Sequence, residues 1–199
     1  MTDSVPSTKI LTIPNLLTFL RMGLIPLFAI LLVYHRSGWA LLVFTIAGVS
    51  DGIDGFIARR FKQESVLGVI IDPIADKLLM TTAFVMLTLP SVMGHGRFLP
   101  VPFWVTATVI GRDVMIVTVA GAINVMTGFR GFKPSWLGKA STFVQVVAVI
   151  MILIAASYPE LRGFYLPTVY TVTAAFAVFS GIHYIFFVAK LMRDDETPA

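Results

Sequence analysis

Residues 51–76 read DGIDGFIARRFKQESVLGVIIDPIAD and place four aspartates within two otherwise apolar segments. An ionised carboxylate inside a membrane helix costs roughly 2.5 to 3.5 kcal/mol, so four carboxylates cost on the order of 10 kcal/mol. Positive charge must offset this cost. The stretch therefore predicts that cations, either basic side chains or metal ions, lie beside the four aspartates, which are Asp51, Asp54, Asp72 and Asp76.

The rest of the chain is strongly apolar. Of its 199 residues, 57% are hydrophobic and 13% are charged, and the mean hydropathy is +0.87. Apolar runs of about 20 residues, the length that crosses a bilayer as a helix, recur along it. These properties predict an all-α, polytopic membrane protein that forms one domain over residues 1–199. The absence of cysteine excludes disulfides, thiolate metal sites and cysteine nucleophiles.

Six membrane-spanning helices are predicted from the apolar runs and from the Pro and Gly residues between them, such as Gly38. Their expected ranges are 15–34, 39–59, 66–90, 100–126, 137–157 and 166–191. An even number of spans places both termini on one side of the membrane. That side holds nine basic residues, Lys9, Arg59, Arg60, Lys62, Arg130, Lys133, Lys139, Lys190 and Arg193, against Arg36, Arg97 and Arg162 opposite.

This distribution of basic residues predicts that both termini are cytoplasmic. We expect a multi-pass protein of a bacterial or archaeal plasma membrane, because the first apolar segment lacks the features of a cleaved signal or transit peptide. The net charge of +4 is then largely on the cytoplasmic face and suits the anionic headgroups of membrane lipids. We expect no nucleic-acid partner.

The aspartates form two pairs, each on one face of a helix. Asp51 and Asp54 are three residues apart, and Asp72 and Asp76 are four residues apart. The connection near residues 60–65 is short, so the two helices form an antiparallel hairpin. At a rise of 1.5 Å per residue, Asp51 and Asp72 both lie roughly 11 to 14 Å from the turn. All four carboxylates can therefore meet at one depth, just inside the cytoplasmic boundary.

Three explanations fit such a cluster. Four oxygen ligands without histidine or cysteine suit Mg²⁺, Mn²⁺ or Ca²⁺, and two such ions would clamp a phosphoryl group. In a purely structural alternative, Asp51 and Asp54 pair with Arg59 and Arg60. In a third, the aspartates are the transport site of a cation or proton transporter. The metal and phosphoryl site is favoured, because glycines on the same hairpin leave its backbone open to a base or a pyrophosphate.

The same residues resemble the signature of the class I CDP-alcohol phosphotransferase family. Every fixed position of that signature is matched by Asp51-x-x-Asp54-Gly55-x-x-Ala58-Arg59, eight residues, Gly68-x-x-x-Asp72-x-x-x-Asp76. The resemblance covers nearly the whole chain and implies the fold of that family. It implies that an alcohol displaces CMP from a CDP-linked donor to give a phosphodiester. It also implies a homodimer.

The resemblance further implies a role for each residue of the signature. Asp51, Asp54 and Asp72 bind two divalent cations, Mg²⁺ or Mn²⁺, while Asp76 lies at the second metal and takes the proton of the acceptor. The residues expected to bind the CDP-linked donor are Asp51, Gly55, Ala58, Arg59, Gly68 and Asp72. The apolar remainder of the chain suggests that the donor is CDP-diacylglycerol.

The acceptor is predicted from other segments. Residues 13–26, IPNLLTFLRMGLIP, resemble the opening of both phosphatidylglycerophosphate synthases and eukaryotic-type cardiolipin synthases. Arg112 in IGRDV and Lys139 in WLGKASTFVQ resemble the basic residues that bind the acceptor phosphate. Simple structural roles remain open, because Arg112 could pair with a carboxylate inside the bundle and Lys139 could extend to the membrane surface.

Our leading prediction is transfer of the phosphatidyl group to sn-glycerol 3-phosphate, which gives phosphatidylglycerophosphate and CMP. The alternative acceptor is phosphatidylglycerol, which gives cardiolipin. The chain departs from many glycerophosphate enzymes, which have Glu where it has Asp113. It resembles the cardiolipin branch at least as closely. The two reactions share their chemistry, but glycerol phosphate arrives from the cytoplasm and phosphatidylglycerol from the bilayer.

Overall fold

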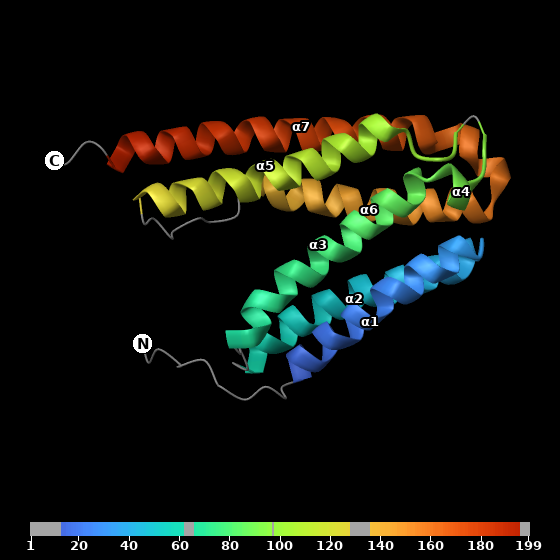
Figure 1. The fold of residues 1–199 in the computed structure, drawn as a ribbon, viewed down its shortest axis with the longest axis horizontal. Helices are drawn as coiled ribbons and strands as arrows, with labels where there is room; N and C mark the ends of the chain where they lie inside the picture. Colours follow the sequence, from blue (N-terminus) through green and yellow to red (C-terminus); the bar gives the residue numbers. More distant parts are fainter. Residues whose placement is uncertain (1–12, 62–65, 97, 128–135, 196–199) are drawn as a thin grey trace.

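The computed structural model describes residues 13–61, 66–96, 98–127 and 136–195, and the side chains of residues 16–52, 68, 71–96, 98–125 and 136–189. Within these residues the protein is all-helical and has no strand, which confirms the predicted class. Six long helices alternate in direction (Figure 1): α1 (Ile13–Val33), α2 (Ser37–Phe61), α3 (Val66–Thr88), α5 (Phe103–Thr127), α6 (Trp136–Ser157) and α7 (Arg162–Asp195). Two short helices, α4 (Pro90–Met93) and η1 (Pro159–Leu161), lie between them.

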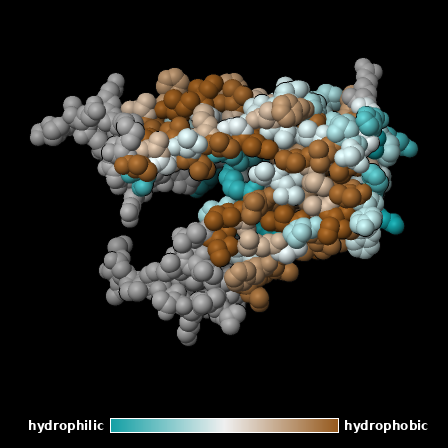
Figure 2. Space-filling view, in the orientation of Figure 1, coloured by the Kyte–Doolittle hydropathy of each residue, from teal (hydrophilic) through white to brown (hydrophobic). Residues whose placement is uncertain are grey.

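Several helices have the length and composition of membrane spans. Within the described residues, four such spans are Leu16–Val33, Phe103–Val125, Trp136–Ser157 and Pro159–Ala189. α2 and α3 carry the aspartates, whose charge lowers the hydropathy of both helices. Large apolar side chains such as Phe164 and Phe186 are exposed on the outside of the bundle, and Figure 2 shows extensive hydrophobic surface. These features are those of a membrane protein.

The long helices pack as two groups. α1 packs against α2 and α3, and α7 packs against α5 and α6. The groups meet where α2 contacts α6 and where α3 contacts α5 and α6. Figure 1 shows that they diverge toward the end of the molecule at which α7 terminates. In the space-filling view a hollow separates the two groups, and hydrophilic residues lie at its inner end (Figure 2).

The connection between α1 and α2 is a tight turn centred on His35. This residue has φ 55°, in the left-handed region that residues other than glycine seldom adopt. The turn is closed by backbone N–H groups that donate back to α1, from His35 to Leu32 O (2.9 Å) and from Arg36 to Leu31 O (2.8 Å). Gly38, which we expected to separate the helices, lies inside α2 because the chain has already reversed at His35.

The start of α7 also differs from the prediction. We expected this helix from residue 166, but it begins at Arg162. The Arg162 guanidinium donates to the carbonyl oxygens of Ala155 (3.0 Å) and Ala156 (3.2 Å), which belong to the last turn of α6. A cation at this position also interacts favourably with the helix dipole. The contact joins α6 to α7 within a few residues, so α7 starts earlier than its apolar run suggests.

Phe44 tests the packing that holds α1 against α2. Its buried ring lies 5.7 Å from that of Phe28, centroid to centroid. Phe44→Ala should lower the thermal midpoint of the purified protein, since truncating a buried Phe costs roughly 3 to 5 kcal/mol in protein cores. The matched control is Phe186→Ala, at a ring that is 70% exposed. Equal losses in both variants would contradict the assigned core.

Candidate functional site

Asp51 on α2 is paired with a buried cation. Its Oδ1 lies 2.6 Å from Nη1 of Arg21, whose side chain is fully buried whereas that of Asp51 is 46% exposed. Arg21 thus supplies part of the positive charge that the aspartates require, from a helix that we did not consider. The sequence could have indicated this pairing, because Arg21 is the only charged residue in the apolar run 15–34 and needs an anionic partner. The side chains of Arg59 and Arg60, the partners that we considered, lie outside the described residues.

Asp72 on α3 also contacts α1. The buried hydroxyl of Thr18 donates a hydrogen bond to Asp72 Oδ1. Thr18 and Arg21 are three residues apart and therefore lie on one face of α1. This face contacts carboxylates on both helices of the predicted hairpin.

Asp51 and Asp76 line a common cavity of about 240 Å³ between α2, α3 and α6. The rest of its wall is mainly apolar and includes Phe44, Leu79 and Ile150. The fold therefore brings one aspartate from each helix of the hairpin to the same space. The cavity has a polar end and an apolar body, which suits an amphipathic ligand.

The donor set of the hairpin fits a hard divalent cation, because it consists of carboxylate oxygens and the half-exposed Asp51 is accessible. Among the side chains that the structure describes, no three acidic, histidine or cysteine groups lie close enough to hold a metal. Asp51 and Asp72 each direct one oxygen toward α1 instead. α2 also carries four further residues predicted to bind the metal or the donor, Asp54, Gly55, Ala58 and Arg59, but their side chains lie outside the described residues. Gly68, another predicted donor-binding residue, is buried on α3. The metal site stays a prediction.

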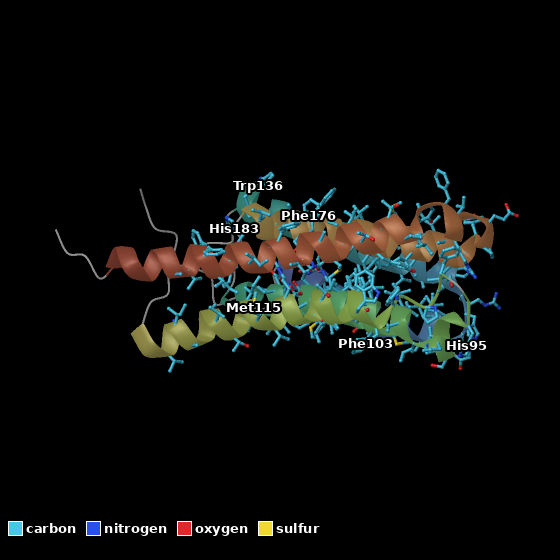
Figure 3. All side chains as sticks on the ribbon, turned by 90° about the horizontal axis from the view of Figure 1, so that it is seen from above. His95, Phe103, Met115, Trp136, Phe176 and His183 are labelled. Atoms are coloured by element: carbon cyan, nitrogen blue, oxygen red, sulfur yellow. The ribbon has the colours of Figure 1, made fainter. Side chains whose placement is uncertain are left out.

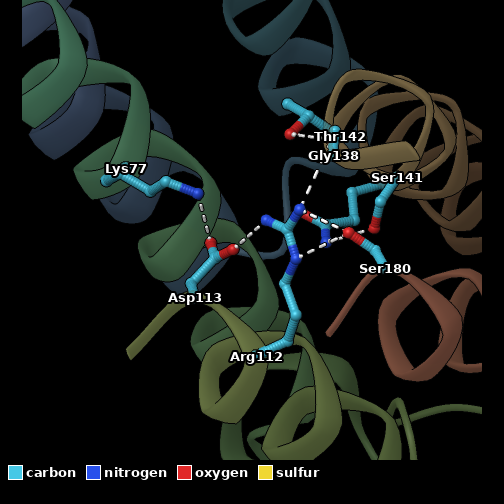
Figure 4. A network of polar contacts seen from close by, with 8 residues as sticks. Lys77, Arg112, Asp113, Gly138, Ser141, Thr142 and Ser180 are labelled. Carbon is cyan, nitrogen blue, oxygen red and sulfur yellow. Dashed lines mark hydrogen bonds and ion pairs between the residues drawn. The ribbon is translucent and has the colours of Figure 1, made fainter. Parts of the chain in front are cut away.

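Arg112 lies on α5 and joins three helices. Its Nη1 donates to Asp113 Oδ1 (2.7 Å), while Nε and Nη2 donate to the hydroxyl of Ser180 on α7 (3.2 and 2.7 Å). Nη2 is also 3.5 Å from the carbonyl oxygen of Gly138 on α6. Lys139, the second predicted acceptor residue, is the exposed neighbour of Gly138. Figure 4 shows Arg112 directed toward the junction of α6 and α7.

Small residues let α5 approach α7 at this level. A Cβ atom at Gly181 would lie 3.0 Å from Met115 Cε and 3.7 Å from Arg112 Cγ. Figure 3 shows Met115 between the two helices. The missing side chain at position 181 therefore leaves room for the terminal methyl group of Met115, while the contact with Arg112 would be an ordinary one.

Asp113 connects this network to the aspartate hairpin. Its Oδ2 lies 2.6 Å from Nζ of Lys77 on α3, the residue that follows Asp76. The two oxygens of one carboxylate thus each accept from a different cation, Lys77 or Arg112 (Figure 4). The structural role that the sequence left open for Arg112, pairing with a carboxylate inside the bundle, is filled by Asp113. The ammonium of Lys77 therefore faces α5.

The Lys77 and Asp113 pair provides a test of the contact between the two helix groups. Lys77→Met, Asp113→Asn and the double variant form a mutant cycle, read by unfolding of the protein in detergent. We expect an interaction free energy of about 0.5 to 3 kcal/mol, because the two residues are in direct contact within one ion-pair network. Lys77→Met combined with Glu160→Gln on η1 is the control and should be additive. Additivity in the first cycle as well would contradict the bridge.

Comparisons with known proteins identify the family that the signature residues resemble. The sequence profile of the CDP-alcohol phosphatidyltransferase family matches residues 11–191. A cardiolipin synthase (CMP-forming) of Streptomyces coelicolor is 34% identical, over 76% of this chain and 69% of the relative. The human cardiolipin synthase (CMP-forming) is 33% identical, over 92% of this chain and 64% of the relative. The CDP-diacylglycerol–glycerol-3-phosphate 3-phosphatidyltransferase of Escherichia coli is 36% identical, over 71% of this chain and 76% of the relative.

These matches confirm the predicted enzyme class, a phosphatidyltransferase of phospholipid biosynthesis that uses CDP-diacylglycerol. Relatives named for each of the two predicted reactions are found. Members of the family are generally dependent on divalent metals. The chain belongs to the CDP-alcohol phosphatidyltransferase family.

Proposed function

We propose that this protein transfers the phosphatidyl group of CDP-diacylglycerol to phosphatidylglycerol, with release of CMP and formation of cardiolipin. The bridge from Lys77 to Asp113 and Arg112 carries the proposal. It supports the proposal because it links Arg112, one of the two cations proposed for the acceptor phosphate, to the helix that carries Asp72 and Asp76. An anionic acceptor held by the cations would then have its hydroxyl near the carboxylates.

In the proposed step, the acceptor hydroxyl oxygen forms a bond to the phosphorus that bears diacylglycerol. The bond from that phosphorus to the oxygen bridging to CMP breaks, and CMP leaves with this oxygen. Asp76 accepts the hydroxyl proton, a role that its place in the cavity beside Asp51 supports. Arg112 and Lys139 orient the acceptor through its phosphate, since guanidinium and ammonium groups bind phosphate oxygens strongly.

The residues proposed to hold two divalent cations, Mg²⁺ or Mn²⁺, are Asp51, Asp54, Asp72 and Asp76. Such ions, when bound, neutralise the charge that develops on the diphosphate. The proposed contacts to the donor come from the same helices, through Gly55, Ala58, Arg59 and Gly68 together with Asp51 and Asp72. Donor binding thus uses the backbone and side chains of the hairpin itself.

The choice of acceptor rests on the comparisons and on the described network. The human cardiolipin synthase matches 92% of the chain, whereas the Escherichia coli glycerol 3-phosphate enzyme matches 71%. In addition, Asp113 partly neutralises Arg112. This neutralisation disfavours a dianionic phosphate more than the single negative charge of a phosphodiester such as phosphatidylglycerol. Glycerol 3-phosphate, our leading prediction from the sequence, becomes the second candidate and is supported by its relative's 36% identity.

The proposed setting is a single domain with six membrane-spanning helices in the plasma membrane. The aspartate hairpin faces the cytoplasm, on the side that the basic residues of the sequence favour. We include α2 and α3 as spans because each packs against helices that are themselves long and apolar enough to cross. The family resemblance supports a homodimer.

Transfer assays with both acceptors test the function. Purified protein receives labelled CDP-diacylglycerol and a divalent cation, with either phosphatidylglycerol or glycerol 3-phosphate. We expect cardiolipin and CMP, with a kcat/KM for phosphatidylglycerol at least about tenfold higher, which corresponds to roughly 1.4 kcal/mol. EDTA should abolish both products. A preference for glycerol 3-phosphate would select the second candidate, and ion flux without CMP release would favour the transporter alternative.

Asp76→Asn tests the proposed base. Loss of proton transfer should lower kcat by roughly 10²- to 10⁴-fold while donor affinity changes little. Calorimetric titration of Mn²⁺ into Asp76→Asn and Asp72→Asn separates a base from a metal ligand. If both variants lose metal affinity equally, Asp76 is chiefly a ligand and its assignment as base is wrong.

A further inference from the structure

The segment IPNLLTFLRMGLIP of α1 contains two polar residues on one buried face. Thr18 is 2% exposed and Arg21 is fully buried, in a helix whose other described residues are almost all apolar. Burying a hydroxyl and a guanidinium in such a helix is unfavourable unless both groups are hydrogen-bonded or paired. Nothing in the proposed reaction uses them directly.

Both residues contact carboxylates of the aspartate hairpin. Thr18 donates to Asp72 Oδ1, and Arg21 Nη1 lies 2.6 Å from Asp51 Oδ1. The two carboxylates belong to different helices, α3 and α2. α1 packs against both of these helices, so one rigid face reaches one carboxylate on each.

We propose that Thr18 and Arg21 are positioning residues that orient the carboxylates of Asp72 and Asp51 for binding a divalent cation. This inference rests on the proposed metal site. Each contact engages one carboxylate oxygen, so each restricts the rotation of its carboxylate about the terminal side-chain bond. Partners that hydrogen-bond to ligating carboxylates typically change metal affinity by 10- to 100-fold.

Neither residue is placed to act on the substrate. Both side chains are buried between α1 and the hairpin, so they act through the aspartates. Arg21 is positively charged and Thr18 is uncharged, so the two residues need different substitutions. Removing the guanidinium would lose its orienting contact and also remove its repulsion of a metal ion, two effects of opposite sign. The uncharged Thr18 has no such ambiguity.

Calorimetric titration of Mn²⁺ into the detergent-purified protein, without substrate, tests Thr18. We expect Thr18→Val to raise the Mn²⁺ dissociation constant by roughly 10- to 100-fold, and Thr18→Ser to restore it to within about threefold of the parent protein. Thr173→Val is the matched control. Thr173 is a buried threonine whose hydroxyl donates to Val169 O on its own helix, so the same substitution there should leave the Mn²⁺ affinity unchanged.

Arg21 is tested with Arg21→Lys, which keeps the positive charge but cannot reproduce the planar guanidinium. Repulsion of the metal is then retained, and only the orienting contact is altered. We expect the Mn²⁺ dissociation constant to rise at least about tenfold. The thermal midpoint of each variant, measured without metal, must remain near that of the parent protein for the comparison to count as positioning.

The outcomes separate this inference from the proposed metal site. If Asp51→Asn and Asp72→Asn weaken Mn²⁺ binding but Thr18→Val stays within about threefold of the parent protein, the role of Thr18 is wrong and the metal site stands. The same result with Arg21→Lys overturns the role of Arg21. If the aspartate variants bind Mn²⁺ as the parent protein does, the metal site itself is wrong. A thermal midpoint lost in Thr18→Val and not regained in Thr18→Ser would also overturn the positioning role.

Discussion

Charged side chains inside an apolar helix bundle need partners, and this requirement governs how the helices of this protein pack. Arg21 meets Asp51 across α1 and α2, and Lys77 meets Asp113 across α3 and α5. One member of each pair is largely buried, Arg21 fully and Asp113 at 12% exposure, and a buried charge is stable only when a partner with good geometry offsets its desolvation. Each pair therefore constrains the rotation and register of two helices more strictly than apolar contacts, which tolerate small shifts.

The same requirement gives the two helix groups different charged side chains where they face each other. The α2 and α3 hairpin carries carboxylates, while α5 carries Arg112, whose guanidinium extends toward Ser180 and Gly138. Asp113 on α5 contacts Lys77 on α3, and its negative charge offsets the repulsion between the cations Lys77 and Arg112. A phosphate-bearing substrate between the proposed metal ions and the partly neutralised guanidinium of Arg112 would meet positive charge on both sides. The hollow between the helix groups in Figure 2 is consistent with this arrangement.

Much of the helical architecture could be predicted from hydropathy alone. The six predicted helices correspond to α1, α2, α3, α5, α6 and α7, and most ends differ by a few residues. The larger differences arise where contacts between segments override local signals. His35 closes the first turn with a positive φ that sequence patterns assign to glycine, and Arg162 extends α7 backward by binding carbonyl groups of α6. The spacing of the aspartates predicted one hairpin face but not the direction in which each carboxylate points.

The helical membrane class and the family can be predicted from local segments, because apolar run length and the fixed spacing of Asp, Gly and Arg residues are properties of such segments. The partners of the charged groups depend on how the helices pack. Thr18 and Asp72 are 54 residues apart, and Arg112 and Ser180 are 68 apart. Which side chains meet over such separations depends on how each helix is rotated and shifted against its neighbours. These rotations and shifts result from the packing of whole helices, so the contacts cannot be predicted from any single segment.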